Sequence, residues 1–368
     1  MIFTVVIAGL VGCDSSTPVS QTATPPKAST PAASVGNSQI PVKTRTLRMQ
    51  SSWSSGLQVQ EQADEFARLI GEMSGGTLKV ESLLGGSVVG AMEVFNAVDT
   101  GVIDIAHSCA FNWVANEPAA PLFGSRPFGL TAMEYIMWLY NYGGLQMWKE
   151  MYDKYNFGWV GACGLNLAED FAWTNKELNT IEDFKGLKFR TVGYWGQILN
   201  SIGAAVVTLP ASELYSSLNT GILDATEFSN PEADFGLGLH EVCKYLYTPG
   251  IHQPTSISEV IVNKNVWTSL TEAERVIIQT AARAVTLQAL SISPINDVAA
   301  LKKFEQHGTQ IRRVPAAVVT EVEKAANKLY AQKCADDPFF KKVWESQEEI
   351  KQIYKAYNNF MDTSAYFD

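Results

Sequence analysis

The chain has too little positive charge to bind a polyanion. It contains 28 Lys and Arg against 38 Asp and Glu, which gives a formal net charge of −10 at pH 7. Nucleic acids and anionic lipid surfaces need clustered Lys and Arg, so we expect neither as a partner. A small anionic ligand stays compatible with this composition, because a single local arginine can outweigh the net charge.

Histidine and cysteine are also scarce. The four His are scattered without metal-hydrolase spacing, and a nucleophilic Cys would need a base such as His107 or His252 within reach. The glycine run 85–90 lacks the Lys-Ser/Thr pair of a phosphate loop. We therefore expect neither an enzyme nor an organic cofactor. Among the five cysteines no spacing indicates zinc or a disulfide framework. We expect buried free thiols at Cys109, Cys163, Cys243 and Cys334. One disulfide between two of these four is the alternative.

The first residues predict export and attachment to a membrane. The apolar run 2–12 is too short to span a bilayer and ends at Cys13 after small residues, which resembles a lipoprotein signal with a lipidated Cys13. The run lacks the preceding Lys or Arg of a signal peptide, and a plain apolar strand is the alternative. Residues 14–45, rich in Ser, Thr, Pro and Ala, read as a flexible linker. We expect an extracytoplasmic, membrane-tethered protein with no later membrane-spanning run.

One sequence pattern occurs twice, 120 residues apart. Glu93–Asp104 and Glu213–Asp224 share Glu, Thr, Gly and Asp at matching positions. Each reads as a helix ended by a glycine, Gly101 or Gly221, and followed by an apolar strand. The repeat predicts two similar α/β halves with a ligand-binding cleft between them. Chance recurrence of a common helix-to-strand junction is the alternative.

Apolar spacing predicts several long helices in the rest of the chain. We expect one aromatic helix over 132–152 and another over 271–291. Pro294 should kink or break the chain there, before a separate helix over 297–307.

An arginine ends a short predicted strand, Leu187–Arg190. Its planar guanidinium matches a carboxylate in two parallel hydrogen bonds and does not lose its charge. At a strand end that faces a cleft, Arg190 would anchor an anionic ligand. A surface arginine in a salt bridge is the alternative.

Several motifs together resemble one known family. Leu187–Arg190, Glu213–Ala225 and Pro127–Leu130 are similar to segments of the DctP family, the substrate-binding proteins of TRAP transporters, and the resemblance covers about residues 46–350. Further segments resemble its branch that binds 2-oxo acids and lactate: Asn112–Trp113, Trp148, Glu227–Phe228, Pro249–Pro254 and Ile261–Lys264.

The resemblance implies an α/β fold of the two-lobed periplasmic-binding-protein kind, type II-like, with a central cleft, hinge strands and C-terminal helices. Lobe I would comprise 46–168 and 254–293, lobe II 169–253 and 294–335, followed by a helical extension over 336–368. Such a protein captures a small 2-oxo or 2-hydroxy monocarboxylate, like pyruvate or lactate, and delivers it to a membrane permease. A lipoprotein that presents the acid to a membrane receptor is the alternative, and the branch also includes homodimers.

In the family, the arginine that Arg190 matches pairs with the ligand carboxylate. In the oxo-acid branch a cation bridges ligand and protein, which implies Glu169, Gln253, the carbonyl of Phe228 and also Glu227 as its ligands. Such oxygen donors suit a hard cation. Two carboxylates favour Ca²⁺, whereas one would also allow Na⁺.

This chain departs from the family pattern at the cation ligands. The branch commonly has Gln and Glu where this chain has Glu169 and Gln253, so carboxylate and carboxamide are exchanged. A small shift of the alignment would bring Asn166 to the site instead of Glu169.

Aromatic and amide side chains are further candidates for the ligand pocket. Beside Arg190, Glu169 and Phe228, the candidate substrate-binding residues are Trp53, Phe111, Asn112 and Trp195. Flat apolar faces would wall the ligand tail while the Asn amide contacts its oxygens. Packing in the core is the alternative for each of these four.

Overall fold

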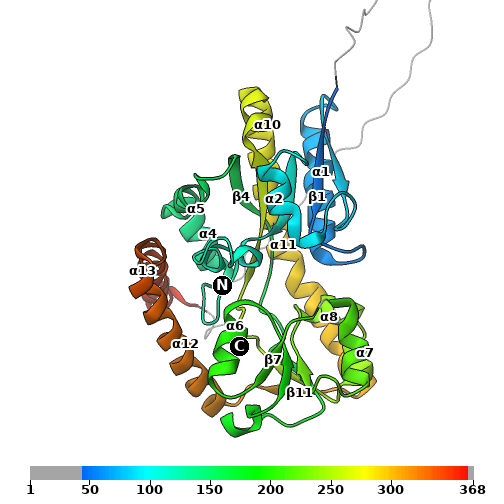
Figure 1. The fold of residues 1–368 in the computed structure, drawn as a ribbon, viewed down its shortest axis with the longest axis vertical. Helices are drawn as coiled ribbons and strands as arrows, with labels where there is room; N and C mark the ends of the chain where they lie inside the picture. The colour runs from blue at the N-terminus through cyan, green and yellow to red at the C-terminus, as the bar shows by residue number, and fades with distance from the viewer. Residues whose placement is uncertain (1–43, 210, 364–368) are drawn as a thin grey trace, which may run out of the picture. The chain divides into compact units, whose positions relative to one another are not determined.

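Two mixed β-sheets with helices against them form the part of the chain that the structure, a computed structural model, describes: residues 44–209 and 211–363 (Figure 1). Sheet A has the strand order β2-β1-β3-β10-β4, and sheet B has the order β11-β9-β5-β8-β6-β7. The mixed α/β architecture with two sheets agrees with the predicted fold class. The predicted signal, Cys13 and the linker up to residue 43 lie outside the described residues.

Sheet A combines strands from the beginning and the later part of the chain. Its strands are β1 (Arg45–Ser51), β2 (Leu78–Leu83), β3 (Ile105–Cys109), β4 (Phe157–Asn166) and β10 (Ser256–Asn263). β1 pairs in parallel with β2 and β3, whereas β10 is antiparallel to both β3 and β4. The helical segments between these strands are α1 (Gln58–Met73), η1 (Ala91–Glu93), α2 (Val94–Asp99), η2 (Ala110–Trp113), α3 (Pro121–Gly124), α4 (Ala132–Asn141) and α5 (Gly144–Tyr152), with α10 (Lys264–Ser269) after β10.

Sheet B is built mainly from the middle of the chain. Its strands are β5 (Ala172–Thr174), β6 (Lys188–Arg190), β7 (Ala205–Val207), β8 (Ala225–Thr226), β9 (Tyr245–Thr248) and β11 (Gln310–Arg313). β6 is parallel to β7 and β8, and β5 is antiparallel to β8 and β9. The remaining helical segments are η3 (Ile181–Phe184), α6 (Gly193–Ser201), η4 (Ala211–Glu213), α7 (Leu214–Asn219), α8 (Pro231–Gly236), α9 (Leu239–Val242), α11 (Glu272–His307), α12 (Ala316–Asp336) and α13 (Pro338–Met361).

The repeated sequence forms the same junction in both sheets. Gly101 and Gly221 follow α2 and α7 with φ of 77° and 72°, a region that costs a glycine little. After each glycine, an aspartate carboxylate accepts a backbone N–H of the neighbouring parallel strand. Asp104 accepts from Arg48 at 2.8 Å, and Asp224 accepts from Lys188 at 3.0 Å. The repeat therefore has a common structural basis, namely a helix stop followed by a carboxylate that ties two strands together.

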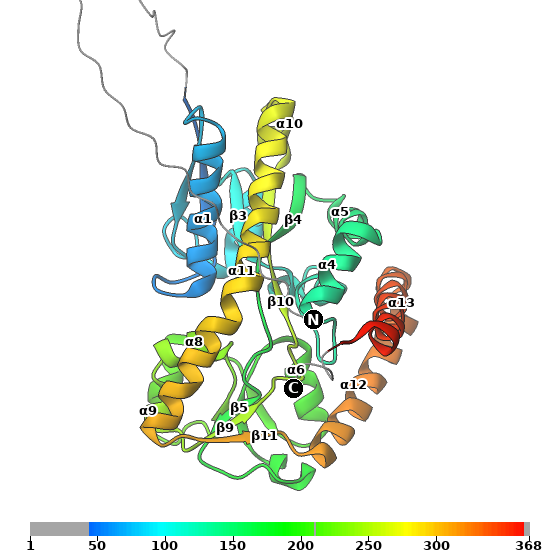
Figure 2. The same cartoon turned by 180° about the vertical axis from the view of Figure 1, so that it is seen from behind.

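Helix α11 is one continuous helix, so the predicted break at Pro294 is wrong. It contacts β4 of sheet A and the adjacent helix α1, and it also contacts β11 of sheet B and helix α8 (Figure 2). A proline removes one helical hydrogen bond and crowds the preceding turn, but apolar packing on both sides can keep a helix continuous. Ala289 before the proline and Phe304 after it are both buried, in two different apolar clusters.

By length and composition alone, α11 is also apolar enough to cross a membrane, contrary to the sequence prediction. Its buried residues, however, pack against the two sheets. Ile278 and Val285 belong to an apolar cluster of sheet A, and Ala300 and Phe304 belong to one of sheet B. The apolar character of α11 is accounted for by its place in two cores.

The predicted helix over 132–152 is two helices, α4 and α5. Gly143 lies between them with φ of 82°, a conformation that a helix interior does not allow. At Gly144, a Cβ atom would lie 2.8 Å from the Trp138 ring, so the turn also needs a residue without a side chain. The four cysteines at 109, 163, 243 and 334 are free thiols, the first three of them buried.

Candidate functional site

Arg190 and Glu227 lie at the carboxyl ends of two neighbouring parallel strands of sheet B. β6 ends at Arg190, which pairs with Thr226 of β8, and Glu227 follows directly. The carboxyl ends of parallel strands are where open α/β sheets bind ligands. The strand register therefore brings together two charged side chains that are 37 positions apart in the sequence.

Arg190 is 7% exposed, and its side chain is only partly bonded to the protein. Its Nε donates to the carbonyl of Leu209 at 3.0 Å, and its Nη1 donates to the carbonyl of Glu227 at 3.0 Å. Nη1 also lies 3.6 Å from Oε1 of the Glu227 carboxylate. Nη2 makes no hydrogen bond with the described residues, so this end of the guanidinium keeps donors for another group.

Backbone hydrogen bonds between two loop segments that are far apart in sequence hold Glu169 close to Glu227. Glu169 donates its backbone N–H to the carbonyl of Gln253 at 3.1 Å, and Gly250 donates to the carbonyl of Glu169 at 2.6 Å. A Cβ atom at Gly250 would lie 2.5 Å from that carbonyl oxygen, so the approach requires glycine. The side-chain amide of Gln253 also donates to the Glu169 carboxylate.

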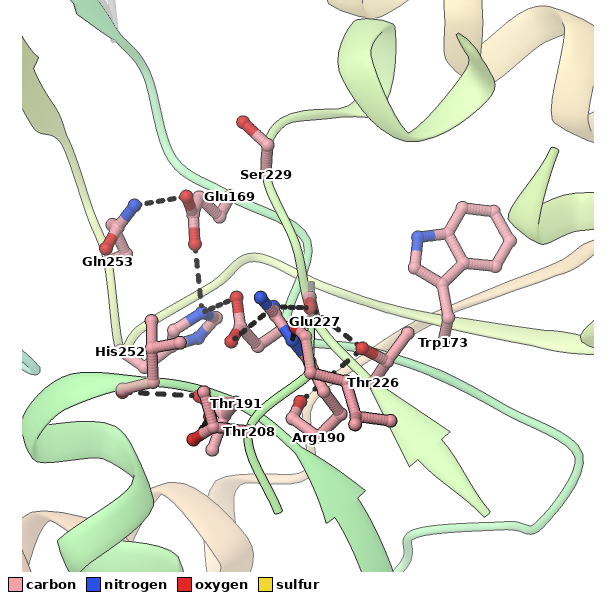
Figure 3. Close-up of polar contacts among 12 residues, drawn as sticks. Glu169, Trp173, Arg190, Thr191, Thr208, Thr226, Glu227, Ser229, His252 and Gln253 are labelled. Carbon is pink, nitrogen blue, oxygen red and sulfur yellow. Dashed lines mark hydrogen bonds and ion pairs between the residues drawn. The ribbon is translucent and has the colours of Figure 1, made fainter. Parts of the chain in front are cut away.

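His252 lies between the two carboxylates, as Figure 3 shows. Its Nε2 is 3.2 Å from Glu169 Oε2 and 3.7 Å from Glu227 Oε2. One potential ligand atom from each of the three residues lies within 4.8 Å of the others, and all three side chains are buried. Oε1 of Glu227 is buried without a hydrogen-bond partner among the described residues. This donor set fits a cation, because two carboxylates converge and one of their oxygens is unsatisfied.

The three residues shift one another's protonation. Burial raises the pKa of the Glu169 carboxyl, against the hydrogen bond from His252. Burial acts in the same direction on Glu227, but the nearby His252 and the charge of Arg190 hold its pKa below the ordinary value. Burial disfavours the charged form of His252, yet the hydrogen bond to Glu169 and the nearby Glu227 carboxylate raise its pKa to about 9. The two carboxylates therefore favour the positively charged form of His252.

A small cavity adjoins this cluster and is lined by segments next to sheet A and by segments next to sheet B. On the side of sheet A it is lined by segments between β3 and α4. On the side of sheet B it is lined by the segments that follow β6, β8 and β9 and by the start of α6. Its lining residues are Phe111, Pro121, Ser125, Pro127, Thr191, Val192, Gly193, Tyr194, Trp195, Glu227, His252 and Gln253.

The other predicted site residues divide into two groups. Phe111 and Trp195 line this cavity, and the Phe228 ring lies 5.9 Å from the guanidinium carbon of Arg190. Trp53 and Asn112 instead bond to β3, where the Trp53 indole donates to His107 at 2.8 Å and the Asn112 amide donates to Ser108 at 3.2 Å. Neither of these two is among the residues that line the cavity.

Sequence reasoning missed His252 and Ser125 as site residues. His252 lies inside the segment Pro249–Pro254 that carried the family resemblance, and it is one of only four histidines in the chain. Its position beside Gln253 could have indicated it. Ser125 follows a short helix and has no local sequence signal.

Comparisons with known proteins show which proteins this chain is similar to. The family model described as DctP, bacterial extracellular solute-binding protein, family 7, matches residues 49–337. A monocarboxylate 2-oxoacid-binding periplasmic protein of Nostoc sp. is 29% identical over 317 residues, which cover 86% of this chain and 87% of that protein.

Two solved structures are similar in fold and sequence. A TRAP periplasmic solute-binding protein from Pseudoalteromonas atlantica, with bound sodium and pyruvate, has a TM-score of 0.83 and 28% identity and covers 88% of this chain and 99% of its own. A corresponding protein from Colwellia psychrerythraea, with bound calcium and pyruvate, has a TM-score of 0.84 and 27% identity, with 89% and 99% covered.

Proposed function

Because this chain belongs to the DctP family of bacterial extracellular solute-binding proteins, which serve TRAP transporters, we propose that it captures a small 2-oxo or 2-hydroxy monocarboxylate. Pyruvate and lactate are the model ligands, and a membrane permease is the recipient. The family consists of receptors, and we propose that this chain likewise binds its ligand without converting it.

The observation that carries the proposal is the buried guanidinium of Arg190. It contacts Glu227 and precedes Thr191, and both of these residues line the cavity. Its Nη2 would bind the ligand carboxylate. A hydrogen bond to a charged group contributes roughly 1.5–3 kcal/mol. Two such bonds would supply a large part of the roughly 8 kcal/mol that micromolar binding requires.

We propose a cation as the second element of the site. Glu169 and Glu227 would hold it, together with Gln253 and the carbonyl of Phe228. When bound, the cation supplies positive charge to the carboxylate and to the adjacent 2-oxygen of the ligand. Two carboxylates favour Ca²⁺ over Na⁺ in this chain. The similar proteins that bind pyruvate with sodium or calcium support a cation of this kind.

Closure of two lobes over the ligand is the proposed mechanism. Lobe I (46–168 and 254–293) would supply Phe111, and lobe II (169–253 and 294–335) would supply Arg190 and Trp195. A ligand that contacts both lobes stabilises the closed form, which the permease then recognises. Lining of one cavity by Phe111 and Trp195 supports this arrangement. Trp53 and Asn112 are proposed to contribute to the same wall from lobe I.

The family works outside the cytoplasm, in the periplasm of its characterised relatives. We propose in addition that Cys13 is lipidated and tethers the protein to the membrane through the linker. Formation of a homodimer also stays a prediction. Mass spectrometry of the exported protein would test the lipid, and light scattering would test the dimer.

A thermal-shift screen of short carboxylic acids, with and without Ca²⁺, tests the proposed function. We expect pyruvate or lactate to raise the melting temperature and Ca²⁺ to increase that shift, because the ligand and ion bind only the folded state. Calorimetry on the responding acid then gives the affinity. A screen in which no short 2-oxo or 2-hydroxy acid stabilises the protein would contradict the proposal.

A further inference from the structure

Besides Nδ1 of His252, two buried hydrogen-bond donors in the cavity wall have no partner among the described residues. They are the hydroxyl of Ser125, on a residue that is 5% exposed, and the indole N–H of Trp195, on a residue that is 3% exposed. Both residues line the cavity. An unsatisfied buried donor costs roughly 1–3 kcal/mol, and folded proteins contain few of them. The role of Arg190 and of the cation leaves these two donors unexplained.

The segment that carries Ser125 is held in place from behind by the C-terminal helices. The next residue, Arg126, is 1% exposed, pairs with Glu348 of α13 at 2.7 Å and lies 3.9 Å above the Trp344 ring. The Tyr330 hydroxyl of α12 donates to the carbonyl of Pro127 at 3.0 Å. This support limits how far the loop can move to give the Ser125 hydroxyl another partner.

The orientation of the Trp195 indole is fixed by two neighbouring rings. It stacks on His252 with centroids 5.2 Å apart and an interplanar angle of 19°. It also meets Phe171 edge to face at 5.6 Å. The ring therefore has little freedom to turn its N–H toward another protein group.

We propose that Ser125 and Trp195 are specificity-determining residues that donate hydrogen bonds to an acceptor oxygen which the ligand carries in addition to its carboxylate. The inference rests on the proposed function of the site. An indole N–H can only donate, so the ligand atom that faces Trp195 must be an acceptor. An acid with an alkyl group in that place leaves both donors unsatisfied. The site then favours a 2-oxo acid over an unsubstituted acid of the same length.

The test compares pyruvate with propanoate in calorimetry on the whole protein with Ca²⁺, using Ser125→Ala and Trp195→Phe. Each substitution should weaken pyruvate binding about 2- to 10-fold, the effect of one neutral hydrogen bond. Propanoate affinity should stay equal or rise, so the preference for pyruvate shrinks. Without ligand, Ser125→Ala should leave the melting temperature unchanged, because the removed hydroxyl does not bond to the protein. Trp195→Phe should lower it, because the smaller ring loses part of its packing on His252 and Phe171.

Ser346→Ala is the matched control, since the Ser346 hydroxyl accepts from the Trp138 indole at 3.0 Å and is not among the cavity residues. It should lower the melting temperature and leave the preference for pyruvate unchanged. The inference is overturned if pyruvate affinity is unaltered in both site variants, or if both acids weaken equally. If pyruvate binds the wild type but these variants change nothing, the inference alone fails. If the wild type binds neither acid, the proposed function fails with it.

Discussion

The two sheets share one helix-to-strand junction but differ in the residue at the end of the strand next to it. In sheet A, Gln50 near the end of β1 donates to the carbonyl of Val89 at 2.8 Å. In sheet B, Arg190 at the end of β6 donates to the carbonyl of Leu209 at 3.0 Å. Val89 and Leu209 are 120 residues apart, the spacing of the sequence repeat. Corresponding strand ends thus carry a neutral amide in one half and a guanidinium in the other.

A second difference concerns two buried glutamates. Glu259 of β10 bonds only to neutral donors, the Trp113 indole at 2.5 Å and the Tyr152 hydroxyl at 3.2 Å, and burial raises its pKa to about 8. Glu227 is equally buried, yet its pKa is held below the ordinary value, since His252 and Arg190 counter the effect of burial. The neighbours of a buried carboxyl, more than its burial, therefore decide whether it is charged.

The largest expected effect concerns Glu259 and pH. Its pKa is about 8 when folded against an ordinary 4.5, so between these values the folded state holds a proton that the unfolded state has lost. The free energy of unfolding should therefore fall as pH rises through this window, by roughly 3–5 kcal/mol from this group. Glu259→Gln should remove that part of the slope.

Urea unfolding of both proteins at pH 5 and pH 8 measures the difference. Glu323→Gln, an exposed glutamate on α12, is the control and should leave the slope as in the wild type. Equal pH slopes for the wild type and Glu259→Gln would show that Glu259 is ionised when folded.

Converting Arg190 to the residue of the other half should have the next largest effect. Arg190→Gln keeps a donor for the Leu209 carbonyl but removes the charge, so pyruvate affinity should fall at least about 10- to 100-fold, since the loss of even one charged hydrogen bond has that effect. Arg313→Gln, at the exposed end of β11, should leave the affinity unchanged in the same calorimetric titration. Unchanged pyruvate binding by Arg190→Gln would refute the assignment.

Removal of the cation should distinguish the role of Glu227 from that of Glu259. Calorimetry in EDTA should show weaker pyruvate binding by the wild type, and added Ca²⁺ should restore it. Glu227→Gln should bind weakly with or without EDTA, because one proposed cation ligand is missing. Glu259→Gln should respond to EDTA like the wild type. Wild-type affinity that EDTA does not alter would remove the cation from the site.

The smallest expected effect concerns the helix-to-strand junction that both halves share. Asp104→Ala and Asp224→Ala each remove an acceptor for a backbone N–H of the adjacent strand. Each should lower the free energy of unfolding by about 1 kcal/mol. Asp224 also pairs with the exposed Lys176 at 3.0 Å, which adds little. Costs that differ by several kcal/mol in urea unfolding would show that the junctions are not equivalent.

The family and several candidate site residues could be predicted from local sequence. The family prediction is confirmed, because ordered motifs such as Leu187–Arg190 and Pro249–Pro254 survive in the chain. Arg190 could be singled out because its residue type and its strand end are both local properties. The helix ends at Gly101 and Gly221 could also be predicted from neighbouring residues. Whether Trp53 and Asn112 contact a ligand stays a prediction, as their contacts in the structure are with β3.

The repeated junction, the arginine at a strand end and the family could be inferred from residues that are neighbours along the chain. The position of His252 between Glu169 and Glu227 depends on the three-dimensional fold, because these residues come from three separate segments. The fold also decided that α11 continues through Pro294 and that Glu259 faces Trp113 and Tyr152. Charge state and helix continuity depend on burial and on partners distant in sequence, which no local pattern contains.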